Sequence, residues 1–419
     1  MLIFYNILSY ILIPLIKINL LIRIINRKED KTRYLERYGI TSKKKPHGKI
    51  LWIHATSIGE FKSADILINN LHKKYNILIT TTTMSAANYA AKKYKNKIIH
   101  QYAPLDVKIW VQRFLDKWRP NICIWIESDL WPITLHLINQ KSIKSILLNL
   151  RISPKSMRRW LFFKTIYARM LDSFDFIFAQ SLIDKERIEK IYQKKISYIG
   201  NLKLASIDNN ITKDFDEKLV AKYKKFRFFL MASTHKNEEV LFIDFIKNVT
   251  NKIDDLKIII APRHSERSNS ITKMLKKYNI KSNIINNEID SINEKVIIVN
   301  TLGDMPFYFS ISDIVFLGGS FVNMGGHNPI EPANNNCVIL SGPHIYNWEN
   351  IFLDMKNINA CKICRDVKEI EKFFEKIYNN PTEMNKFKKN AINFANKKFF
   401  ESQELFTTIN NIIENYKNA

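Results

Sequence analysis

The sequence predicts an α/β protein with two doubly wound, Rossmann-like domains behind an N-terminal hydrophobic segment. Its 419 residues suit two domains, and short apolar runs alternate with segments of helical period in both halves. The third observation is that Lys17 is the single charged side chain in the first 22 residues. Because 46% of the residues are hydrophobic, the chain can fill two cores, which excludes global disorder.

Composition excludes several other classes. Only 10 glycines and 12 prolines are present, so the chain is neither collagen-like nor of low complexity. Four cysteines are too few for a disulfide scaffold, and a reducing compartment fits best. The formal net charge of +25 suits nucleic acid, an anionic membrane surface or phosphorylated substrates, and it equally suits solvated helix faces.

Residues 1–30 are expected to form a membrane anchor. A bilayer span needs roughly 20 apolar residues, and the run from Met1 to Ile22 sits at that margin, with Pro14 and Lys17 inside it. No cleavage motif or basic region marks it as a removable signal peptide. Basic residues follow the run, so the positive-inside rule places the rest of the chain at the cytoplasmic face of the membrane. A helix lying in the membrane interface is the open alternative.

Residues 31–206 are expected to form the first Rossmann-like domain. Longer segments of helical period, such as Phe61–Lys74 and Ser85–Tyr94, separate short and almost continuously apolar strands. That pattern is typical of a parallel sheet with helices on both faces. The expected strands are Ile50–His54, Ile77–Thr81, Ile122–Ile126, Ile146–Asn149 and Phe176–Ala179.

Residues 207–419 are expected to form the second domain, because the same alternation restarts after the polar stretch Ser206–Lys225. A return of the last helix to the first domain is left open. A ligand cleft is expected between the domains, at the carboxyl ends of their strands. The expected strands here are Phe228–Ala232, Leu256–Ala261, Val296–Asn300, Ile314–Leu317 and Val338–Leu340.

Two carboxylates follow strands in the first domain. Glu60 closes the run His54–Glu60, which indicates a strand turning into a helix, and Glu127 directly follows Ile122–Ile126. Gly59 would let a ligand come close to Glu60. One acid is suited to remove a proton from a hydroxyl, and the other to stabilise positive charge on a sugar carbon. The alternative for Glu60 is a plain helix cap. The alternative for Glu127 is a helix cap or an ion pair with a nearby arginine.

Side chains that carry cations or amides follow two further strands of this domain. The runs Asn149–Ser153 and Gly200–Lys203 offer side chains toward the same sheet edge. Lys203 is the candidate that would neutralise a departing phosphate.

The second domain offers an anion site. Pro262–His264 ends a strand, and the fork of an arginine suits a phosphate. The glycine pairs in Gly318–Ser320 and Gly325–Gly326 would let backbone N–H groups approach an anion.

A helix start follows these glycines. Asn328 is expected as the cap and Pro329 as the first helical residue. Glu331 is expected to accept hydrogen bonds from ribose hydroxyls, so the site is interpreted as nucleotide-binding. A well-capped helix without a ligand is the alternative.

Taken in chain order, these motifs resemble those of the 3-deoxy-D-manno-octulosonic acid (Kdo) transferases of lipid A assembly. The matching runs are His54–Glu60, Glu127–Pro132, Gly200–Lys203, Ala232–His235, Ala261–His264 and Gly325–Pro332. The resemblance extends to about Asn350 and implies a GT-B glycosyltransferase with an N-terminal acceptor domain and a C-terminal donor domain. It further implies CMP-Kdo as donor and a lipid A precursor, the tetraacyldisaccharide 4'-phosphate, as acceptor.

The resemblance also assigns roles to residues. Glu60 matches the general base of the family, and Glu127 and Lys203 match positions that assist the transition state. Asp304 stands where the family usually has Glu, so only a backbone role carries over there. The segments that match CMP binding are Pro262, Arg263, Gly303, Asp304, Met305, Asn328, Pro329, Ile330 and Glu331.

No cofactor and no metal are expected, because Lys203, Arg263 and helix ends can supply the positive charge that a departing phosphate needs. The donor half has no Asp-x-Asp pair at a strand end, and the pair Cys361 and Cys364 lacks the second pair of a zinc site. Three histidines, His235, His264 and His327, border the same region and either donate to the phosphate or cap the chain locally.

The run Arg158–Lys164 mixes cations with aromatic and aliphatic side chains. Such a surface suits contact with inner membrane phospholipid or acyl chains. A buried helix with basic flanks is the favoured alternative, because aromatic stripes usually face a core.

Two rival functions remain. A different GT-B transferase that uses a UDP-sugar would share the fold and the ribose-binding glutamate. A membrane-tethered nucleic-acid-binding protein is suggested by the charge alone, and the recognition elements that it needs are not evident, so no nucleic acid partner is expected.

Overall fold

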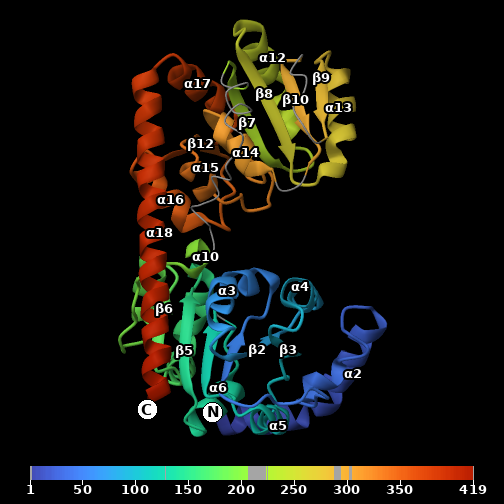
Figure 1. The fold of residues 1–419 in the computed structure, drawn as a ribbon, viewed down its shortest axis with the longest axis vertical. Helices are drawn as coiled ribbons and strands as arrows, with labels where there is room; N and C mark the ends of the chain where they lie inside the picture. The colour runs from blue at the N-terminus through green and yellow to red at the C-terminus, as the bar shows by residue number, and fades with distance from the viewer. Residues whose placement is uncertain are drawn as a thin grey trace. The chain divides into compact units, whose positions relative to one another are not determined.

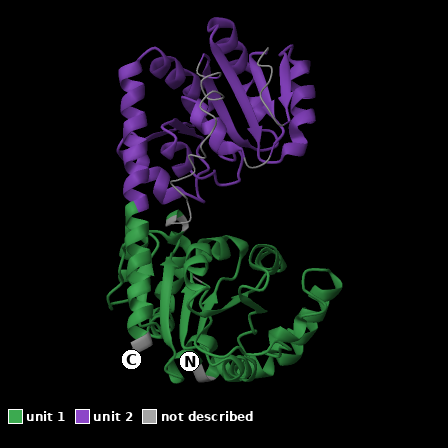
Figure 2. Cartoon of the chain, viewed as in Figure 1, with its two compact units in different colours: residues 1–207, 400–419 green, residues 208–399 purple. Residues whose placement is uncertain are grey.

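The computed structural model describes residues 2–127, 129–205, 223, 225–286, 294–301 and 304–418. The chain forms two compact units, one of residues 1–207 with 400–419 and the other of residues 208–399 (Figure 2). The expected boundary between residues 206 and 207 lies outside the described residues. The final helix contributes to both units, and its part from residue 400 onward belongs to the first one.

The first unit holds a six-stranded parallel sheet in the order β3-β2-β1-β4-β5-β6 (Figure 1). This is the Rossmann strand order. Successive strands are added on one side of β1 as far as β3 and on its other side from β4 onward, and doubly wound proteins bind ligands at this switch between β1 and β4. The strands are β1 (Ile50–His54), β2 (Asn76–Thr81), β3 (Ile99–Tyr102), β4 (Ile122–Ile126), β5 (Lys144–Leu150) and β6 (Phe176–Ala179). The helices are α1 (Leu2–Ile11), α2 (Ile13–Ile25), η1 (Tyr34–Tyr38), α3 (Ile58–Leu71), α4 (Met84–Tyr94), α5 (Lys108–Trp118), α6 (Pro132–Gln140), α7 (Pro154–Phe162), α8 (Lys164–Leu171), α9 (Leu182–Glu189) and α10 (Leu202–Ala205).

Apolar side chains cover both faces of this sheet, as continuous apolar strands require. Trp52 and Trp125 pack on one face with Phe114 of α5. On the other face, Ile53 and Ile124 pack with helix α3 and with the C-terminal part of α18 (Pro381–Asn418). That part of α18 buries Leu405, Ile409 and Ile413.

The second unit holds a seven-stranded parallel sheet in the order β13-β12-β11-β7-β8-β10-β9. Its direction reverses between β7 and β11. The strands are β7 (Arg227–Thr234), β8 (Leu256–Pro262), β9 (Ser282–Ile285), β10 (Val296–Val299), β11 (Ile314–Leu317), β12 (Val338–Ser341) and β13 (Cys361–Ile363). The helices are η2 (Glu239–Phe242), α12 (Ile243–Lys252), η3 (Ser265–Arg267), α13 (Ser268–Lys277), α14 (Met305–Ile311), α15 (Ile330–Asn334), α16 (Glu349–Asn357) and α17 (Val367–Tyr378). The two doubly wound sheets predicted from the sequence are therefore confirmed.

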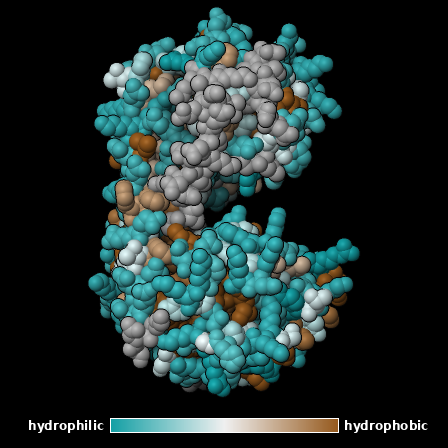
Figure 3. All heavy atoms as spheres, viewed as in Figure 1, coloured by the Kyte–Doolittle hydropathy of each residue, from teal (hydrophilic) through white to brown (hydrophobic). Residues whose placement is uncertain are grey.

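The N-terminal segment forms two helices instead of one continuous anchor. Within the described residues, no single helix is long and apolar enough to cross a membrane, and only α1 and α2 together, bent by 56°, meet the length and composition of a span. Much of their apolar surface is exposed, and hydrophobic atoms are visible over the α2 segment in Figure 3. Glu29 holds the segment to the unit, because its carboxylate pairs with Arg23 at 3.3 Å and with Arg37 at 2.7 Å.

The expectation that Arg158–Lys164 forms a buried helix is wrong. Helix α7 buries none of its residues, and Phe162 is 87% exposed. Trp160 packs its ring against Tyr167 of α8, at 4.9 Å between centroids, and Leu161, Phe162 and Phe163 remain exposed. A basic helix of the first unit therefore presents apolar side chains to its surroundings.

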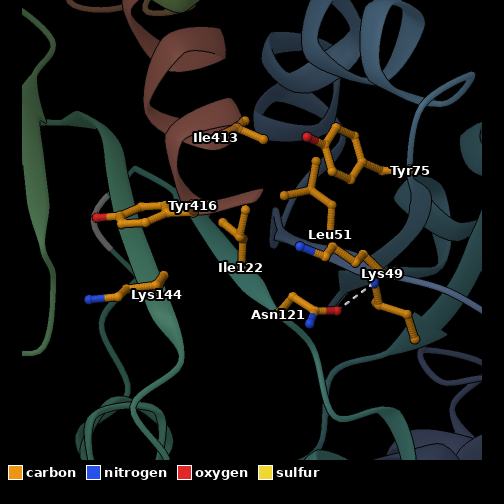
Figure 4. A pocket seen from close by; sticks show the side chains of 9 residues that line it. Lys49, Leu51, Tyr75, Asn121, Ile122, Lys144, Ile413 and Tyr416 are labelled. Carbon is orange, nitrogen blue, oxygen red and sulfur yellow. Dashed lines mark hydrogen bonds between the residues drawn. The ribbon is translucent and has the colours of Figure 1, made fainter. Parts of the chain in front are cut away.

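A small cavity of about 200 Å³ lies at the amino ends of β1, β4 and β5 (Figure 4). Ile413 and Tyr416 of α18 line it, with the Lys144 amino group 5.3 Å from the Tyr416 ring centre. The Asn121 side chain accepts a hydrogen bond of 2.9 Å from the Ile50 amide. No carboxylate is among the described residues that line this cavity, and it lies at the sheet edge opposite to Glu60 and Glu127.

Candidate active site

Glu60 lies in the first turn of α3, directly after the turn that follows β1. Ser57 is the N-cap of this helix and accepts a hydrogen bond from the Glu60 amide. The Glu60 carboxylate accepts bonds from the Thr56 amide at 2.6 Å and from the hydroxyls of Thr56 and Ser57. The residues of a capping box thus fix the orientation of this carboxylate.

Burial raises the pKa of Glu60 above its ordinary value, although the hydrogen bonds of Thr56 oppose this effect, and the charge of Glu127 raises the pKa further. The two carboxylates therefore lie close enough to repel each other. They follow β1 and β4, which are neighbours at the reversal point of the sheet. A raised pKa makes a carboxylate a stronger base, which suits it to accept a proton from a hydroxyl.

Glu127 stands in an unusual backbone conformation. Its φ angle is 65°, which is uncommon for a residue other than glycine. Asn149 at the end of β5 has φ 56°, so two adjacent strands of one sheet end with left-handed residues at this edge. Such strain is enriched at functional sites.

Asn149 positions the run that carries Lys203. Its side chain donates to Asn201 at 3.1 Å and accepts a bond of 2.9 Å from the Leu202 amide, at the start of α10. Gly200 is required because a Cβ there would lie 2.5 Å from the Glu401 carbonyl oxygen of α18. The backbone of Lys203 lies in α10, and its side chain lies outside the described residues.

In the second unit, the glycine-rich turn after β11 does not offer its amides to a ligand. The Glu238 carboxylate accepts bonds from the amides of Gly319, Ser320 and Phe321, at 2.7, 3.1 and 3.0 Å. Burial raises the pKa of Glu238, and these backbone bonds oppose the shift. The expectation that Gly318–Ser320 binds an anion through its amides is therefore wrong, because a carboxylate of the chain already fills this position.

The second glycine pair also serves local packing. Gly325 has φ 85°, and a Cβ there would lie 2.5 Å from the Tyr346 ring. The Gly326 amide donates to the Gly319 carbonyl at 3.0 Å. These contacts connect the turn after β11 to the turn that precedes α16.

The structure does bring the predicted basic and imidazole side chains together at this edge. His235 follows β7, and its Nε2 lies 3.0 Å from Nε2 of His327, with the rings stacked at 5.2 Å. Burial, together with the smaller effects of the His235 and Arg263 charges, lowers the pKa of His327 to about 4. Desolvation raises the pKa of Glu331, and the Asn328 hydrogen bond and the Arg263 charge oppose that shift. Arg263 therefore acts on both His327 and Glu331.

The helix expected at Pro329 begins at Ile330 instead and has five residues, so its dipole is small. Asn328 still organises the turn, since its side chain accepts from the Ile330 amide at 3.0 Å and donates to Glu331 at 3.2 Å. Asp304 flanks α14 without a side-chain cap, and Met305 is the first helical residue. Gly303 lies outside the described residues.

Two supporting acids were not anticipated from the sequence. Glu239 pairs with Arg267 through two bonds of 2.8 Å and accepts from the Thr234 hydroxyl at 2.6 Å. Glu238 holds the glycine turn as described above. The adjacent glutamates that follow the run Ala232–His235 were the available signal, but sequence alone does not distinguish a buried anion from a solvated helix start.

Within the described residues, no group of three or more His, Cys, Asp or Glu side chains is arranged to hold a metal ion. Cys361 and Cys364 are both buried free thiols. Burial raises the pKa of each thiol to about 12, which keeps both protonated.

Solved structures resemble the chain over most of its length. A UDP-GlcNAc 2-epimerase from Neisseria meningitidis is 11% identical with a TM-score of 0.58, covering 86% of this chain and 99% of its own. A glycosyltransferase from Rickettsia africae ESF-5 is 14% identical with a TM-score of 0.57, covering 88% and 100%. With the two doubly wound sheets, these likenesses define the GT-B fold.

The sequence comparisons are more specific. A family model described as 3-Deoxy-D-manno-octulosonic-acid transferase (kdotransferase) matches residues 32–206. The 3-deoxy-D-manno-octulosonic acid transferase of Rickettsia felis is 30% identical, covering 94% of this chain and 96% of its own, and that of Rickettsia conorii is 31% identical with the same coverage. The transferase of Haemophilus influenzae is 31% identical over 83% of this chain and 84% of its own. The chain belongs to this family of Kdo transferases and is a glycosyltransferase.

Proposed function

We propose that this enzyme moves Kdo from CMP-Kdo to the tetraacyldisaccharide 4'-phosphate precursor of lipid A, with inversion at the anomeric carbon. The observation that carries this proposal is the pair Glu60 and Glu127 at the reversal point of the first sheet, in a chain of the Kdo transferase family. Membership of the family supports Kdo as the transferred sugar, and the carboxylate pair supports the mechanism of its transfer.

Glu60 is the proposed general base. A sugar hydroxyl is a poor nucleophile, so the Glu60 carboxylate takes its proton while the hydroxyl oxygen attacks the anomeric carbon of Kdo. The bond between that carbon and the phosphate oxygen of CMP breaks on the opposite side, and its electron pair leaves with the phosphate. One displacement of this kind inverts the configuration. Glu127 stabilises the positive charge that develops at the sugar carbon.

The departing CMP gains negative charge, which cations must stabilise. Lys203 and Arg263 are the proposed sources, so the reaction is proposed to need neither metal nor cofactor. His235 and His327 lie beside Arg263 and are suited to hydrogen-bond the phosphate.

CMP is proposed to bind the second unit at the carboxyl ends of its strands. Pro262 ends β8 and Arg263 follows it. Met305 begins α14, and Gly303 and Asp304 precede it in the sequence. Asn328, Pro329, Ile330 and Glu331 complete the site, and Glu331 accepts bonds from the ribose hydroxyls. The exposed guanidinium of Arg263 and the turn held by Asn328 support this placement.

We infer a place for the enzyme at the cytoplasmic face of the inner membrane, with α1 and α2 in the membrane interface. The exposed apolar side chains of these helices and the bend of 56° support an interfacial position more than a straight span. Phospholipid is therefore a proposed partner, and α7 offers a second apolar and basic contact.

Donor choice tests this proposal. Purified enzyme is incubated with the acceptor and either CMP-Kdo or UDP-N-acetylglucosamine, and the product lipid is weighed by mass spectrometry. The proposal expects addition of Kdo from the first donor only. Turnover of the UDP-sugar alone would assign the chain to a different GT-B reaction.

A further inference from the structure

A slot of about 490 Å³ lies away from the candidate active site, between α1, α6 and α8. Each helix contributes residues about one turn apart, which line up on a single face. They include Phe4 and Leu8 from α1, and Ile166 and Met170 from α8. The volume is in the range of sites that bind small molecules.

Polarity changes along this slot. Side chains of α1, Pro132 at the start of α6, and Ile166 and Met170 of α8 supply the apolar part of the wall. Asn139, Arg169, Asp172 and Ser173 lie near or just beyond the carboxyl ends of α6 and α8. A ligand that matches the slot is therefore apolar along most of its length and polar at one end.

The polar end carries basic side chains without partners. Among the residues that the structure describes, neither the Arg169 guanidinium nor the His136 imidazole has a hydrogen bond or ion pair. Asp172, at the same end, is already paired with Lys194 and bonded by Tyr192. The charge that remains available is positive and suits a phosphate.

The slot is continuous with an exposed apolar surface. Phe4 lines it and is 69% exposed, and Ile7 and Ile11 on the same helix are 54% and 67% exposed. An acyl chain that leaves a bilayer beside α1 could therefore enter the slot without crossing polar surface.

We propose that this slot binds one acyl chain of a membrane phospholipid, with the lipid phosphate at Arg169. The inference goes beyond the proposed transferase activity, because the ligand is a bilayer lipid and not a substrate. A resident lipid of this kind would tie α1, α6 and α8 to the membrane at a fixed orientation.

The test uses full-length protein and vesicles of phosphatidylethanolamine and phosphatidylglycerol. The vesicles contain phosphatidylglycerol with a photoactivatable diazirine on one acyl chain, and crosslinked peptides are mapped by mass spectrometry. Wild type should carry adducts at Ile166 and Met170. Thr165→Trp, at an exposed position on the slot wall, should reduce them about tenfold, whereas Thr407→Trp on exposed α18 surface should not.

Charge is tested in the same vesicles. Arg169→Glu should reduce the slot adducts several-fold, whereas Lys190→Glu, an equal charge change at an exposed site, should leave them unchanged. Unaltered melting temperatures establish that all variants fold. Adducts confined to the exposed faces of α1 and α2, or equal yields in Thr165→Trp and wild type, would overturn the proposal. If the wild-type protein is a dimer and Thr165→Trp makes it monomeric, the slot binds a second copy of the chain. That result would also overturn the proposal.

Discussion

At the scale of the residue, Glu60 has the contacts of a helix cap and the raised pKa that our proposed catalytic base requires. Its carboxylate is bonded by Thr56 and Ser57, which is the geometry of a cap. Burial and Glu127 nevertheless raise its pKa, and a cap alone gains nothing from that shift. The two interpretations that the sequence left open are therefore compatible, because the cap orients the carboxylate that we propose as the base.

The coupling between the two carboxylates predicts a change in pH dependence. Transfer should fall as pH drops through the pKa of Glu60, because the protonated acid cannot accept a proton. In Glu127→Gln the like charge is absent, so the pKa of Glu60 falls and the acidic limb of the kcat/KM profile should move to lower pH. Glu186→Gln, an exposed position on α9, is the control. An acidic limb that stays in place, or moves upward, would contradict the coupling.

Substitutions at Gly59 and Gly200 distinguish a glycine needed for ligand approach from a glycine needed for folding. A Cβ there meets only Ser57 Oγ at 3.7 Å, which is an ordinary contact, and its φ does not require glycine. Gly59→Ala should keep the melting temperature but lower kcat/KM by about 10²-fold, if a substrate approaches this face. Gly200→Ala should instead lower stability by about 1–3 kcal/mol, because its Cβ would collide with backbone of α18. Equal loss of stability in both variants would contradict this division.

Buried histidines predict how stability depends on pH. Burial lowers the pKa of His54, which is fully buried, to about 3. Between about pH 6.5 and 3, the unfolded chain binds a proton on His54 that the folded chain does not. The free energy of unfolding should therefore fall on acidification, by about 1.4 kcal/mol per pH unit for this residue.

The measurement is urea unfolding of wild type, His54→Phe and His47→Phe between pH 7 and pH 4.5. His54→Phe should show a shallower loss than wild type, and His47→Phe should follow wild type. Parallel curves for all three proteins would show that His54 is not the source.

At the scale of the element, the interior strands and the edge strand β6 were predictable, and the other three edge strands were not. β1, β4, β6 and β11 have the bounds expected from their apolar runs. The missed strands β3, β9 and β13 lie at sheet edges and carry polar residues such as His100, Asn283 and Lys362. An edge strand is covered by fewer neighbours, so its sequence carries a weaker apolar signal.

The candidate site was predictable to a similar extent. Strand ends placed Glu60, Glu127, Arg263 and His235 correctly, because carboxyl ends of parallel strands share one edge. Glycine content suggested a ligand near Gly319, but Glu238 occupies those amides. The local sequence indicates that an anion can approach these backbone amides. Only tertiary packing determines whether that anion is a ligand or a carboxylate of the chain itself.

The last turns of α18 are predicted to stabilise the first unit. Leu405 is fully buried against α3 and the first sheet, so Leu405→Ala should cost about 2–5 kcal/mol in the free energy of unfolding. Phe400→Ala on the same helix should cost little, because Phe400 is 69% exposed. Chemical denaturation compares the two, and equal costs would contradict the packing of α18 on this unit.

At the scale of the whole molecule, each unit carries its own sheet, its own core and its own group of polar residues at the reversal point. The carboxylates belong to the first unit, whereas Arg263, the stacked histidines and Glu331 belong to the second. This division predicts that proton transfer and nucleotide binding can be lost separately by substitution. Substitution of Glu60 should therefore abolish proton transfer and leave nucleotide binding intact.

The most direct test is a transfer assay with wild type and Glu60→Gln, using CMP-Kdo and the lipid A precursor, with CMP affinity measured in parallel. The account predicts that transfer falls by about 10²–10⁴-fold in the variant while CMP binds as tightly as to wild type. Transfer by Glu60→Gln at the wild-type rate would contradict the assignment of the base.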